Sequence, residues 1–555
     1  MINKKDFFKQ RAENFSRQVA ELNSRYNLYS FYRIAVFIAF IIPLIWFVKS
    51  DLLIGVVLIS IVFILAFALL IKRHNQISRL RGLNQKMLDL NKEEVDRLNY
   101  EFNGIYNGDD FIDEKHPYTS DLDIFGRNSI FQLINRACTR KGISLIKSWF
   151  ENASSLDVIE TRQQAVTELR PLVDWRQKIQ AFGRENSNKK LDEQPFYDWL
   201  EGDDLIKNNL FYRIIPYITI VFSISIIVGV IFGKLSFYFL LSPFIITGYF
   251  LFKIIDYSKA TYEMTQTGVS ILESVENIIL QIENVDFEHN YLSTLRSSLV
   301  PQNIVASAKI KDLKTIFDWL SQRSNMMYLI FNSIFLLDFI LLARAEKWRA
   351  KYKDEISRWF DAIAEFEALS SIAAFAFANE DYVFPEIAEN AFFVHGTNLG
   401  HPLIPDDQRI NNDFKLEGRG NSCIITGSNM AGKSTFLRTV GINAILAFTG
   451  APVCADSFQI SNVRVFTSMR TKDNLEENIS SFYAELLRLK MLLEQINEDK
   501  PVLFLLDEIL KGTNSADRHI GAESLILQLN EMNAFGLVST HDLELGKLQR
   551  KNNQL

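Results

Sequence analysis

Four long apolar segments interrupt a chain in which apolar and polar residues otherwise alternate at short intervals. Residues 52–71 form an uncharged run of about twenty residues, the length that a helix needs to cross the hydrocarbon of a bilayer. The other three segments are 34–48, 214–232 and 235–252. Short turns at Lys49-Ser50-Asp51 and Gly233-Lys234 join the segments in pairs, so the pattern predicts two transmembrane helical hairpins. Buried helices of a soluble protein are the alternative, but such helices seldom stay uncharged over this length.

Cations flank the predicted hairpins, whereas the two connecting turns carry one Lys each. The cations before and after the first hairpin are Lys4, Lys5, Lys9, Arg11, Arg17, Arg25, Arg33, Lys72, Arg73, Arg79 and Arg81. Positively charged segments next to membrane helices remain on the cytoplasmic side. We therefore expect a multi-pass protein of the plasma or inner membrane, with its N-terminus, helical core and C-terminal domain in the cytoplasm.

A fifth apolar segment, residues 326–342, contains polar groups that the other four lack. Asn332 and Asp338 lie within it, and Arg344 follows it. An unpaired carboxylate at bilayer depth is costly. This segment is therefore predicted to be a buried cytoplasmic helix.

The N-terminal segment carries apolar residues at alternating steps of four and three. They are Phe8, Ala12, Phe15, Val19, Leu22, Tyr26 and Tyr29. Three heptads are close to the minimum for a coiled coil. We expect this seam to pack on the amphipathic helix around residues 77–100, and dimerisation through it is the alternative.

The remaining pattern divides the chain into helical and α/β parts. Apolar residues at helical spacing predict helices on both sides of the second hairpin. From residue 381, short apolar runs separated by turn residues predict alternating strands and helices. The predicted fold class is α/β plus all-α. Its segments are an amphipathic helix (1–33), the first hairpin (34–72), a helical linker (73–117), helical core (118–210), the second hairpin (211–256), further helical core (257–380) and an α/β domain (381–555).

Residues 427–434 satisfy the phosphate-binding pattern G-x-x-x-x-G-K-[ST], with a β-branched run before them and a helix-compatible stretch after them. The glycines let backbone N–H groups surround phosphate oxygens at a helix N-terminus, the lysine adds a cation, and the serine can ligate Mg²⁺. The candidate nucleotide-binding residues here are Gly427, Asn429, Met430, Ala431, Gly432, Lys433, Ser434 and Thr435.

Two further apolar runs end in polar residues that suit phosphate chemistry. Residues 502–506 lead into Asp507 and Glu508, and residues 536–540 lead into His541. In parallel sheets the carboxyl ends of buried strands carry the ligands. Asp507 is predicted to hold Mg²⁺ with Ser434, Glu508 to activate the attacking water, and His541 to sense the γ-phosphate. Together with Lys433, these residues indicate an ATPase.

Amino-acid composition bears on the possible partners of the protein and on the compartment in which it works. The 60 Lys and Arg residues against 66 Asp and Glu residues leave a formal charge of -6, so no global basic field favours nucleic acid. The three cysteines, Cys138, Cys423 and Cys454, lack metal-ligand spacing and suit a reducing compartment.

Six short motifs resemble the MutS family of DNA mismatch-repair ATPases, whose nucleotide domain is of the ABC type. They are HPLI (401–404), NND (411–413), ITGSNMAGKSTFLR (425–438), SSFYAEL (480–486), LLDEILKGTN (505–514) and STHDLEL (539–545). The Asn429-Met430 pair is characteristic of this family. Residues 121–142, 159–169 and 313–348 are similar, more weakly, to its helical core and lever helices.

The resemblance implies a homodimer with two composite ATP sites and binding to DNA. Ser480 and Ser481 would reach the γ-phosphate bound by the other subunit, and residues 512–514 would pass along the dimer interface. Arg409 stands where the family often places an aromatic residue against adenine. The sequence departs from the family in having no G-x-F-[FY]-E element, with which the family contacts mismatches.

The leading hypothesis is a membrane-anchored MutS-like ATPase that uses ATP and Mg²⁺ to open and close a dimeric clamp, with no other small-molecule substrate. An ABC-type half-transporter is the first alternative, although the predicted spans contain no charged residue for a substrate path and no L-S-G-G-Q motif is present. A membrane scaffold that uses ATP only as a conformational ligand, without DNA binding, is the second.

Overall fold

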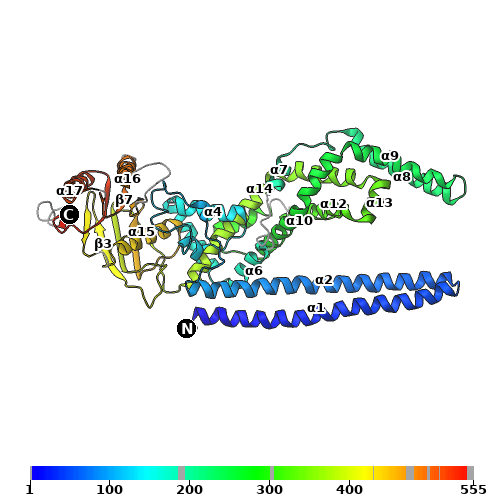
Figure 1. Cartoon of the computed structure of the whole chain (residues 1–555), viewed down its shortest axis with the longest axis horizontal. Helices are drawn as coiled ribbons and strands as arrows, with labels where there is room; N and C mark the ends of the chain where they lie inside the picture. Colours follow the sequence, from blue (N-terminus) through cyan, green and yellow to red (C-terminus); the bar gives the residue numbers. More distant parts are fainter. Residues whose placement is uncertain are drawn as a thin grey trace. The chain divides into compact units, whose positions relative to one another are not determined.

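The computed structural model describes residues 3–184, 194–300, 305–428, 431–470, 481–496, 500–511 and 513–546. These residues form two compact units (Figure 1). The first unit comprises Met1–Asn135, Ile146–Val173 and Ser371–Leu555, and the second comprises Arg136–Leu145 and Asp174–Ser370.

An antiparallel helical hairpin begins the first unit. Helices α1 (Lys4–Lys49) and α2 (Leu53–Leu98) each contain 46 residues and continue without a break from the polar into the apolar part of the sequence. The turn between them includes Asp51, whose φ is +53°. The seam residues Phe8, Ala12 and Val19 are buried. The predicted packing of the N-terminal seam on the second amphipathic helix is confirmed, because the Arg81 guanidinium lies 4.2 Å from the centroid of the Tyr26 ring and Arg11 Nε donates to Asn91 Oδ1 at 3.1 Å.

Short helices follow this hairpin along the chain, and a long helix precedes the α/β domain. The predicted helices between residues 118 and 183 are present as α3 (Ile130–Ile134), α4 (Arg140–Glu151), α5 (Leu156–Leu169) and α6 (Val173–Gly183). Helix α14 (Leu337–Ala378) ends just before the first strand.

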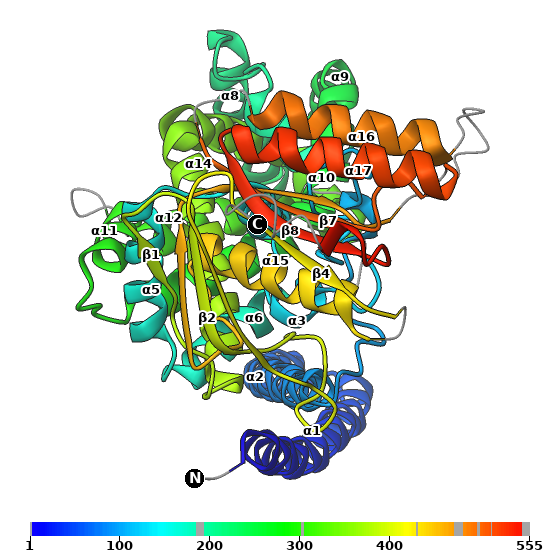
Figure 2. The ribbon, with the colours of Figure 1, turned by 90° about the vertical axis from the view of Figure 1, so that its left-hand side faces the viewer.

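A parallel four-stranded sheet forms the centre of the α/β domain. Its strand order is β4-β8-β7-β6, with β4 (Ser422–Thr426), β6 (Arg464–Ser468), β7 (Val502–Asp507) and β8 (Ala534–Thr540). Helix α15 (Lys433–Thr449) covers one face, and α16 (Ser481–Ile496) and α17 (Ser515–Glu531) cover the other (Figure 2). Every residue of β7 is buried, as expected of a strand covered on both faces.

Alternate residues of β7 explain how the two faces are filled. Phe504 and Leu506 belong to the apolar cluster shared with α16 and α17. Leu505 points the other way, toward Gly441 of α15, where an added Cβ would lie 2.8 Å from the Leu505 side chain. The helix that follows the phosphate-binding loop is therefore held tightly against the sheet.

A second, mixed sheet lies in the same domain. Its strand order is β1-β5-β2-β3, and β2 pairs with both β3 and β5 in antiparallel fashion. The strands are β1 (Glu386–Ala388), β2 (Phe393–Leu399), β3 (Asn412–Glu417) and β5 (Ser457–Ser461). The predicted change to α/β structure after residue 380 is confirmed.

The second unit is helical in its described residues. It contains α7 (Gln194–Glu201), α8 (Leu210–Ile231), α9 (Leu241–Lys253), α10 (Ile255–Glu283), α11 (Asn290–Ser298), α12 (Ala306–Ser321), α13 (Met326–Phe335) and most of α14. Helices α8 and α9 form the second apolar hairpin, with a turn at Gly233, whose φ is +69°, and a short 3-10 helix at Phe237–Leu240.

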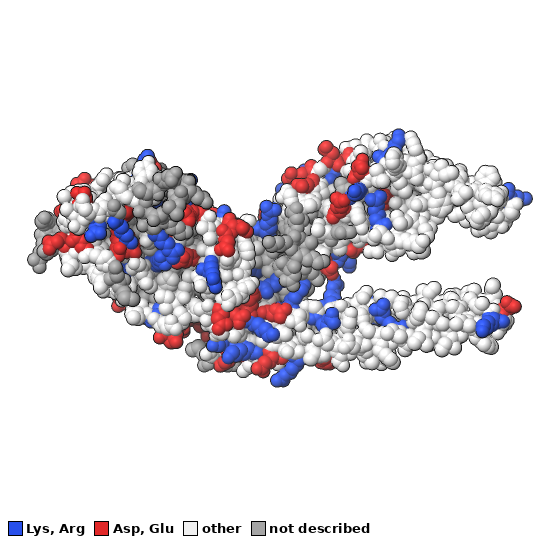
Figure 3. Space-filling view, in the orientation of Figure 1, with Lys and Arg blue, Asp and Glu red and all other residues white. Residues whose placement is uncertain are grey.

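The apolar hairpins expose their apolar side chains. Among the described residues, α1, α2 and α8 are long and apolar enough to cross a membrane, and two bent helix pairs meet the same test of length and composition. The most apolar 18-residue windows of α1 and α2 have no buried residues. Figure 3 shows broad uncharged surfaces along the outer parts of the α1–α2 hairpin and of the α8–α9 hairpin. Charged residues lie at the tips of the hairpins and toward the rest of each unit. Exposed apolar surface of this extent marks contact with a partner or a lipid phase.

The prediction of a single buried helix over residues 326–342 is wrong. The segment is broken at Leu336, whose φ is +52°, and α13 and α14 meet at an angle of 86°. Met326 and Met327 of α13 are 77% and 57% exposed. The prediction counted Asp338 as an unpaired charge, whereas its carboxylate has a cation, Arg323, at 2.6 Å.

Candidate active site

The loop between β4 and α15 surrounds the head of Lys433. Gly432 has a φ of +81° and begins the helix in a conformation that favours glycine. The Lys433 side chain is buried, and its Nζ donates hydrogen bonds to the carbonyl oxygens of Gly427 at 2.6 Å and Ser428 at 2.9 Å. No side chain caps the N-terminus of α15. A cation and the positive end of a helix therefore meet at one point, which suits an anion.

Three adjacent strands bring the other predicted residues to this point. β4, β8 and β7 are neighbours in the sheet, so their carboxyl ends lie along one edge. His541, which follows β8, has its Nδ1 2.8 Å from the carbonyl oxygen of Gly427 and 3.3 Å from Lys433 Nζ. Its Nε2 contacts the Glu508 carboxylate. His541 thus bridges the phosphate-binding loop and the acid after β7.

Asp507 and Glu508 take different positions at the end of β7. Asp507 is largely buried and accepts a hydrogen bond from the Ser539 hydroxyl of β8. The backbone N–H of Glu508 donates to the Ser539 carbonyl at 2.9 Å. Glu508 itself has a φ of +50°, which turns the chain away from the strand direction. The two carboxylates are consequently directed to separate parts of the site.

Glu508 is held as a carboxylate by its neighbours. Burial alone would raise its pKa, but Lys511, whose Nζ lies 3.2 Å away, and His541 together keep the pKa of Glu508 below its ordinary value. The acid is therefore ionised at neutral pH, as a general base must be.

The loop after Glu508 is tied to α16 by a buried glutamate. Glu485 accepts hydrogen bonds from the backbone N–H groups of Leu510 and Lys511, the latter at 3.1 Å. Burial raises the pKa of Glu485, and these two N–H groups oppose that shift. The sequence placed Glu485 in a motif without giving it a role, and the contact shows that it positions the loop that carries Lys511.

A short segment of the helical core also contacts the sheet edge. Asp121 is buried, and its carboxylate accepts hydrogen bonds from Thr467 Oγ1 at 2.7 Å and from the backbone N–H groups of Met469 and Arg470 at 3.1 Å each. The end of β6 is therefore fixed by a residue that precedes it by more than three hundred positions.

Asp123 continues this contact to the helix of the phosphate-binding loop. Its carboxylate lies 3.0 Å from Arg438 Nη1 and 2.8 Å from Arg470 Nη1. Arg438 stands on α15, five residues after Lys433. Sequence reasoning missed both aspartates, although the motif DLD was visible as part of the weaker family resemblance.

The remaining predicted residues are placed as follows. Ser434 and Thr435 lie in the first turn of α15, and the Ala431 N–H donates to the Ser428 carbonyl at 3.2 Å. Ser481 is the first residue of α16. Asn429, Met430, Ser480 and Gly512 lie outside the described residues.

Arg409 is engaged by protein groups. Its guanidinium lies 2.6 Å from Asp406, donates to Tyr382 Oη at 3.1 Å and to Asn411 Oδ1 at 3.1 Å. The positive charge of Arg409 is therefore paired with a carboxylate of the protein. Stacking of Arg409 on adenine stays a prediction.

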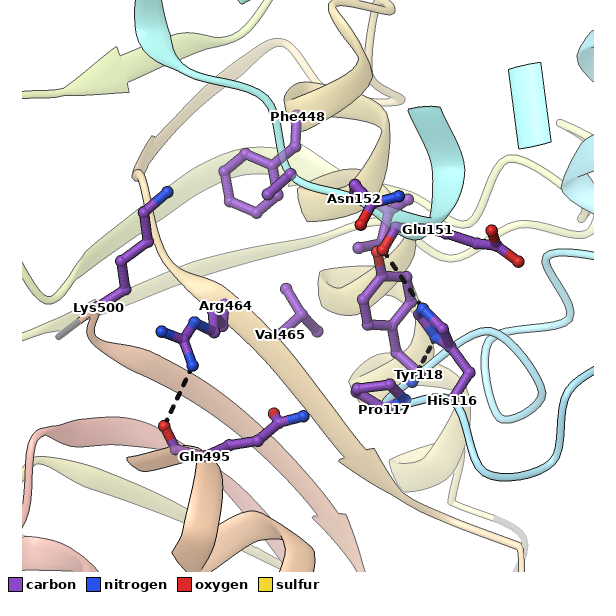
Figure 4. Close-up of a pocket in the computed structure, with 12 residues that line it drawn as sticks. His116, Pro117, Tyr118, Glu151, Asn152, Phe448, Arg464, Val465, Gln495 and Lys500 are labelled. Atoms are coloured by element: carbon purple, nitrogen blue, oxygen red, sulfur yellow. Dashed lines mark hydrogen bonds between the residues drawn. The ribbon is translucent and has the colours of Figure 1, made fainter. Parts of the chain in front are cut away.

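A cavity of about 510 Å³ lies elsewhere in the first unit (Figure 4). Arg464 donates to the Gln495 carbonyl at 3.4 Å on one side, and the His116 ring lies 3.3 Å from the Glu151 carbonyl on the other. Burial lowers the pKa of His116. The phosphate-binding loop does not line this cavity, so it is separate from the candidate active site.

A phosphate-binding loop, an acidic pair and a histidine at neighbouring strand ends define the class of P-loop nucleoside-triphosphate hydrolases. Comparison with known proteins is more specific, because residues 423–555 match the family MutS domain V. This domain is an ABC-type ATPase, so the chain carries an ATPase domain of this type at its C-terminus.

Relatives of known function are similar over part of the chain. The DNA mismatch repair protein MutS of Haloquadratum walsbyi is 28% identical over 290 residues, which are 51% of this chain and 29% of the relative. MutS of Chlorobium phaeovibrioides is 34% identical over 197 residues, 34% of the chain and 22% of the relative. Endonuclease MutS2 of Bacillus velezensis is 32% identical over 155 residues, 28% and 20% respectively. The chain thus spans less than a third of the length of each of these relatives.

Proposed function

We propose that the protein is a membrane-anchored, MutS-like ATPase in which ATP binding and hydrolysis change the arrangement of the helical core. The observation that carries the proposal is the position of His541, which lies within hydrogen-bond distance of the Gly427 carbonyl and contacts Glu508. Residues that would bind phosphate, activate water and respond to the γ-phosphate are thereby brought together at one sheet edge.

Each residue has a separate task in this proposal. Lys433 and the first turn of α15 bind the β- and γ-phosphates. Among the described residues no three His, Cys, Asp or Glu side chains form a metal cluster, and Mg²⁺ commonly binds through one or two protein groups plus substrate phosphates. Ser434 and Asp507 would supply those groups, and the ion would neutralise phosphate charge. Glu508 accepts the proton of the attacking water.

Asp121 and Asp123 couple the nucleotide-binding site to the helical core. Asp123 contacts Arg438 on the same helix as Lys433, and Asp121 holds the end of β6. A shift of α15 on binding would therefore change the position of residues 118–126, which belong to the core segment. These contacts supply the physical route of the coupling.

The exposed apolar surfaces of α1, α2 and α8 support the anchoring part of the proposal. A bilayer covers such surfaces without a protein partner, and the helices are long enough to span it. The DNA part rests on the names of the relatives, which are DNA mismatch repair proteins, and on none of the described side chains. A dimer that completes each ATP site with Ser480 and Ser481 of the other subunit follows from the same similarity.

ATP turnover of the full chain in lipid nanodiscs tests the proposal. Glu508→Gln removes the proton acceptor while keeping the shape of the side chain, so kcat should fall by at least about 100-fold with ATP binding retained. Glu494→Gln, on the exposed side of α16, is the matched control and should leave kcat unchanged. Equal turnover in wild type and Glu508→Gln would overturn the assigned base, and absence of turnover in the wild type would leave ATP as a conformational ligand only.

The same assay tests the DNA part. Mismatched or branched duplex DNA should change the turnover rate, and the change should weaken as salt is raised because phosphate contacts release counterions. A rate that is independent of DNA at low salt would remove DNA from the proposal and leave the ATPase and the anchor in place.

A further inference from the structure

Helix α13 lies beside the second apolar hairpin and is shorter than either of its helices. Its ten residues extend for about 15 Å, half the thickness of the hydrocarbon core. In Figure 1, α13 runs next to α8 and α9 and stops before their outer turn. We propose that α13 is a half-length membrane helix that enters the bilayer together with α8 and α9, an inference that rests on the anchoring part of the proposed function.

One side of α13 is apolar and exposed. The exposed residues are Met326, Met327, Leu329, Ile330 and Phe331, which are 41% to 77% exposed. The opposite side, with Tyr328 and Asn332, is buried. α13 itself carries no charged residue. The exposed side is continuous with the hairpin against which the helix packs, so an environment that covers α8 and α9 also covers α13.

The C-terminal carbonyl groups of α13 are satisfied by protein donors. Ser223 of α8 donates to the Ile334 carbonyl at 3.0 Å, and Thr247 of α9 donates to the Ser333 carbonyl. The Asn332 carbonyl accepts the Leu336 N–H at 3.0 Å. A helix that ends in water needs no such donors, whereas one that ends within hydrocarbon must pair these groups inside the protein.

The carboxylate of Asp338, next to α13, is also paired with groups of the protein. Asp338 is fully buried and has Arg323 at 2.6 Å, and it accepts hydrogen bonds from Tyr328 Oη at 2.6 Å and Ser258 Oγ at 3.1 Å. Its backbone N–H donates to Asn332 Oδ1 at 2.9 Å. A carboxylate with this set of partners is tolerated near hydrocarbon, which an isolated one is not.

Lipid rather than a protein is the occupant that these features favour. The exposed side chains of α13 offer no polar group that could orient a protein partner, whereas Tyr328 and Asn332 are buried. A second copy of the chain or another protein would instead exclude lipid from this surface, and that outcome is distinguishable.

Photocrosslinking with lipids tests the inference on the full chain. The protein is reconstituted in phosphatidylcholine bilayers that contain a lipid with a diazirine on one acyl chain, placed either near the headgroup or near the terminal methyl. Trypsin separates α8 (peptide 214–234), α13 (peptide 324–344) and a polar control peptide within α14 (354–358), and mass spectrometry gives the labelled residues.

The expected result is labelling of residues 326–331 severalfold above the control peptide with the diazirine near the headgroup, and labelling of α8 with both lipids. Label on 214–234 without label on 324–344 would overturn the inference for α13 and leave the anchor standing. Absence of label from both peptides would overturn the anchor as well. Equal labelling of the control peptide would show nonspecific exposure and would also count against the inference.

Discussion

The sheet edge of the ATPase domain and the apolar helices α1, α2, α8 and α9 make opposite use of their residues. At the sheet edge, function depends on the identity of single side chains, because Lys433, Glu508 and His541 each contact a specific atom of a neighbour. Along the apolar helices, the average composition of some twenty residues suffices for a span, and most side chains face outward.

This difference predicts where substitutions matter. One atom changed at the sheet edge alters the chemistry, whereas one apolar residue exchanged for another on an exposed helix surface changes little. The apolar helices have exceptions, which are the polar groups that hold them to other helices: Asp338 beside α13, and the hydroxyls of Ser223 and Thr247. Substitutions at these positions therefore test how far the comparison holds.

The largest effect on stability is expected at Asp338. Asp338→Asn removes the negative charge and leaves Arg323, which is mostly buried, without its counter-ion. Breaking a buried pair in this way costs about 3 kcal/mol or more. Thermal unfolding of the second unit, followed by near-UV circular dichroism in a mild detergent, should begin at a clearly lower temperature.

A double variant controls for the loss of the side chain itself. Replacing both charges, as Arg323→Met with Asp338→Leu, should recover much of the lost stability because no uncompensated charge remains. If the double variant is as unstable as the two single variants combined, the pair is not coupled and its assigned role is wrong.

Asp121 is the buried aspartate of the first unit that corresponds to Asp338 of the second. Asp121→Ala leaves the N–H groups of Met469 and Arg470 without their acceptor, and we expect a loss of about 2–3 kcal/mol in the free energy of unfolding. Asp123→Ala is the matched comparison. Its carboxylate is about one third exposed, so its ion pairs should contribute about 1 kcal/mol or less.

The two variants also distinguish an effect on the stability of the fold from an effect on the nucleotide-binding site. Urea unfolding of both variants gives the stability difference, and ATP affinity gives the effect on the nucleotide site. A larger loss of stability in Asp123→Ala than in Asp121→Ala would contradict the burial argument.

Much of this arrangement could be predicted from the sequence. The phosphate-binding loop, the acids after β7 and the histidine after β8 follow from a local rule, because strand ends in a parallel sheet carry ligands. The hairpins follow from composition and length. The positions of Gly427, Lys433 and His541 relative to one another then follow from the order of the strands.

What could not be predicted depended on partners distant in sequence. The sequence-based prediction considered only the charge of Asp338 itself. The structure shows that the chain bends by 86° between α13 and α14, and that Asp338 forms an ion pair with Arg323. Asp121 belongs to a segment whose contact lies nearly 350 residues further along the chain. Periodicity describes one helix at a time and gives no access to such pairs.

The smallest predicted effect concerns the two hydroxyls that hold α13. Ser223→Ala and Thr247→Val each remove one hydrogen bond to a carbonyl of α13, and an interhelical hydrogen bond of this kind contributes about 0.6 kcal/mol. Ser225→Ala is the matched control on α8, because the Ser225 hydroxyl donates only within its own helix, to Val221. Hydrogen exchange of the α13 backbone should rise by about threefold in each variant and stay unchanged in the control, since a threefold change corresponds to roughly 0.6 kcal/mol. Equal exchange in Ser223→Ala and Ser225→Ala would show that the Ser223 hydroxyl does not hold α13, and Ser223 would then no longer be an exception among the residues of the apolar helices.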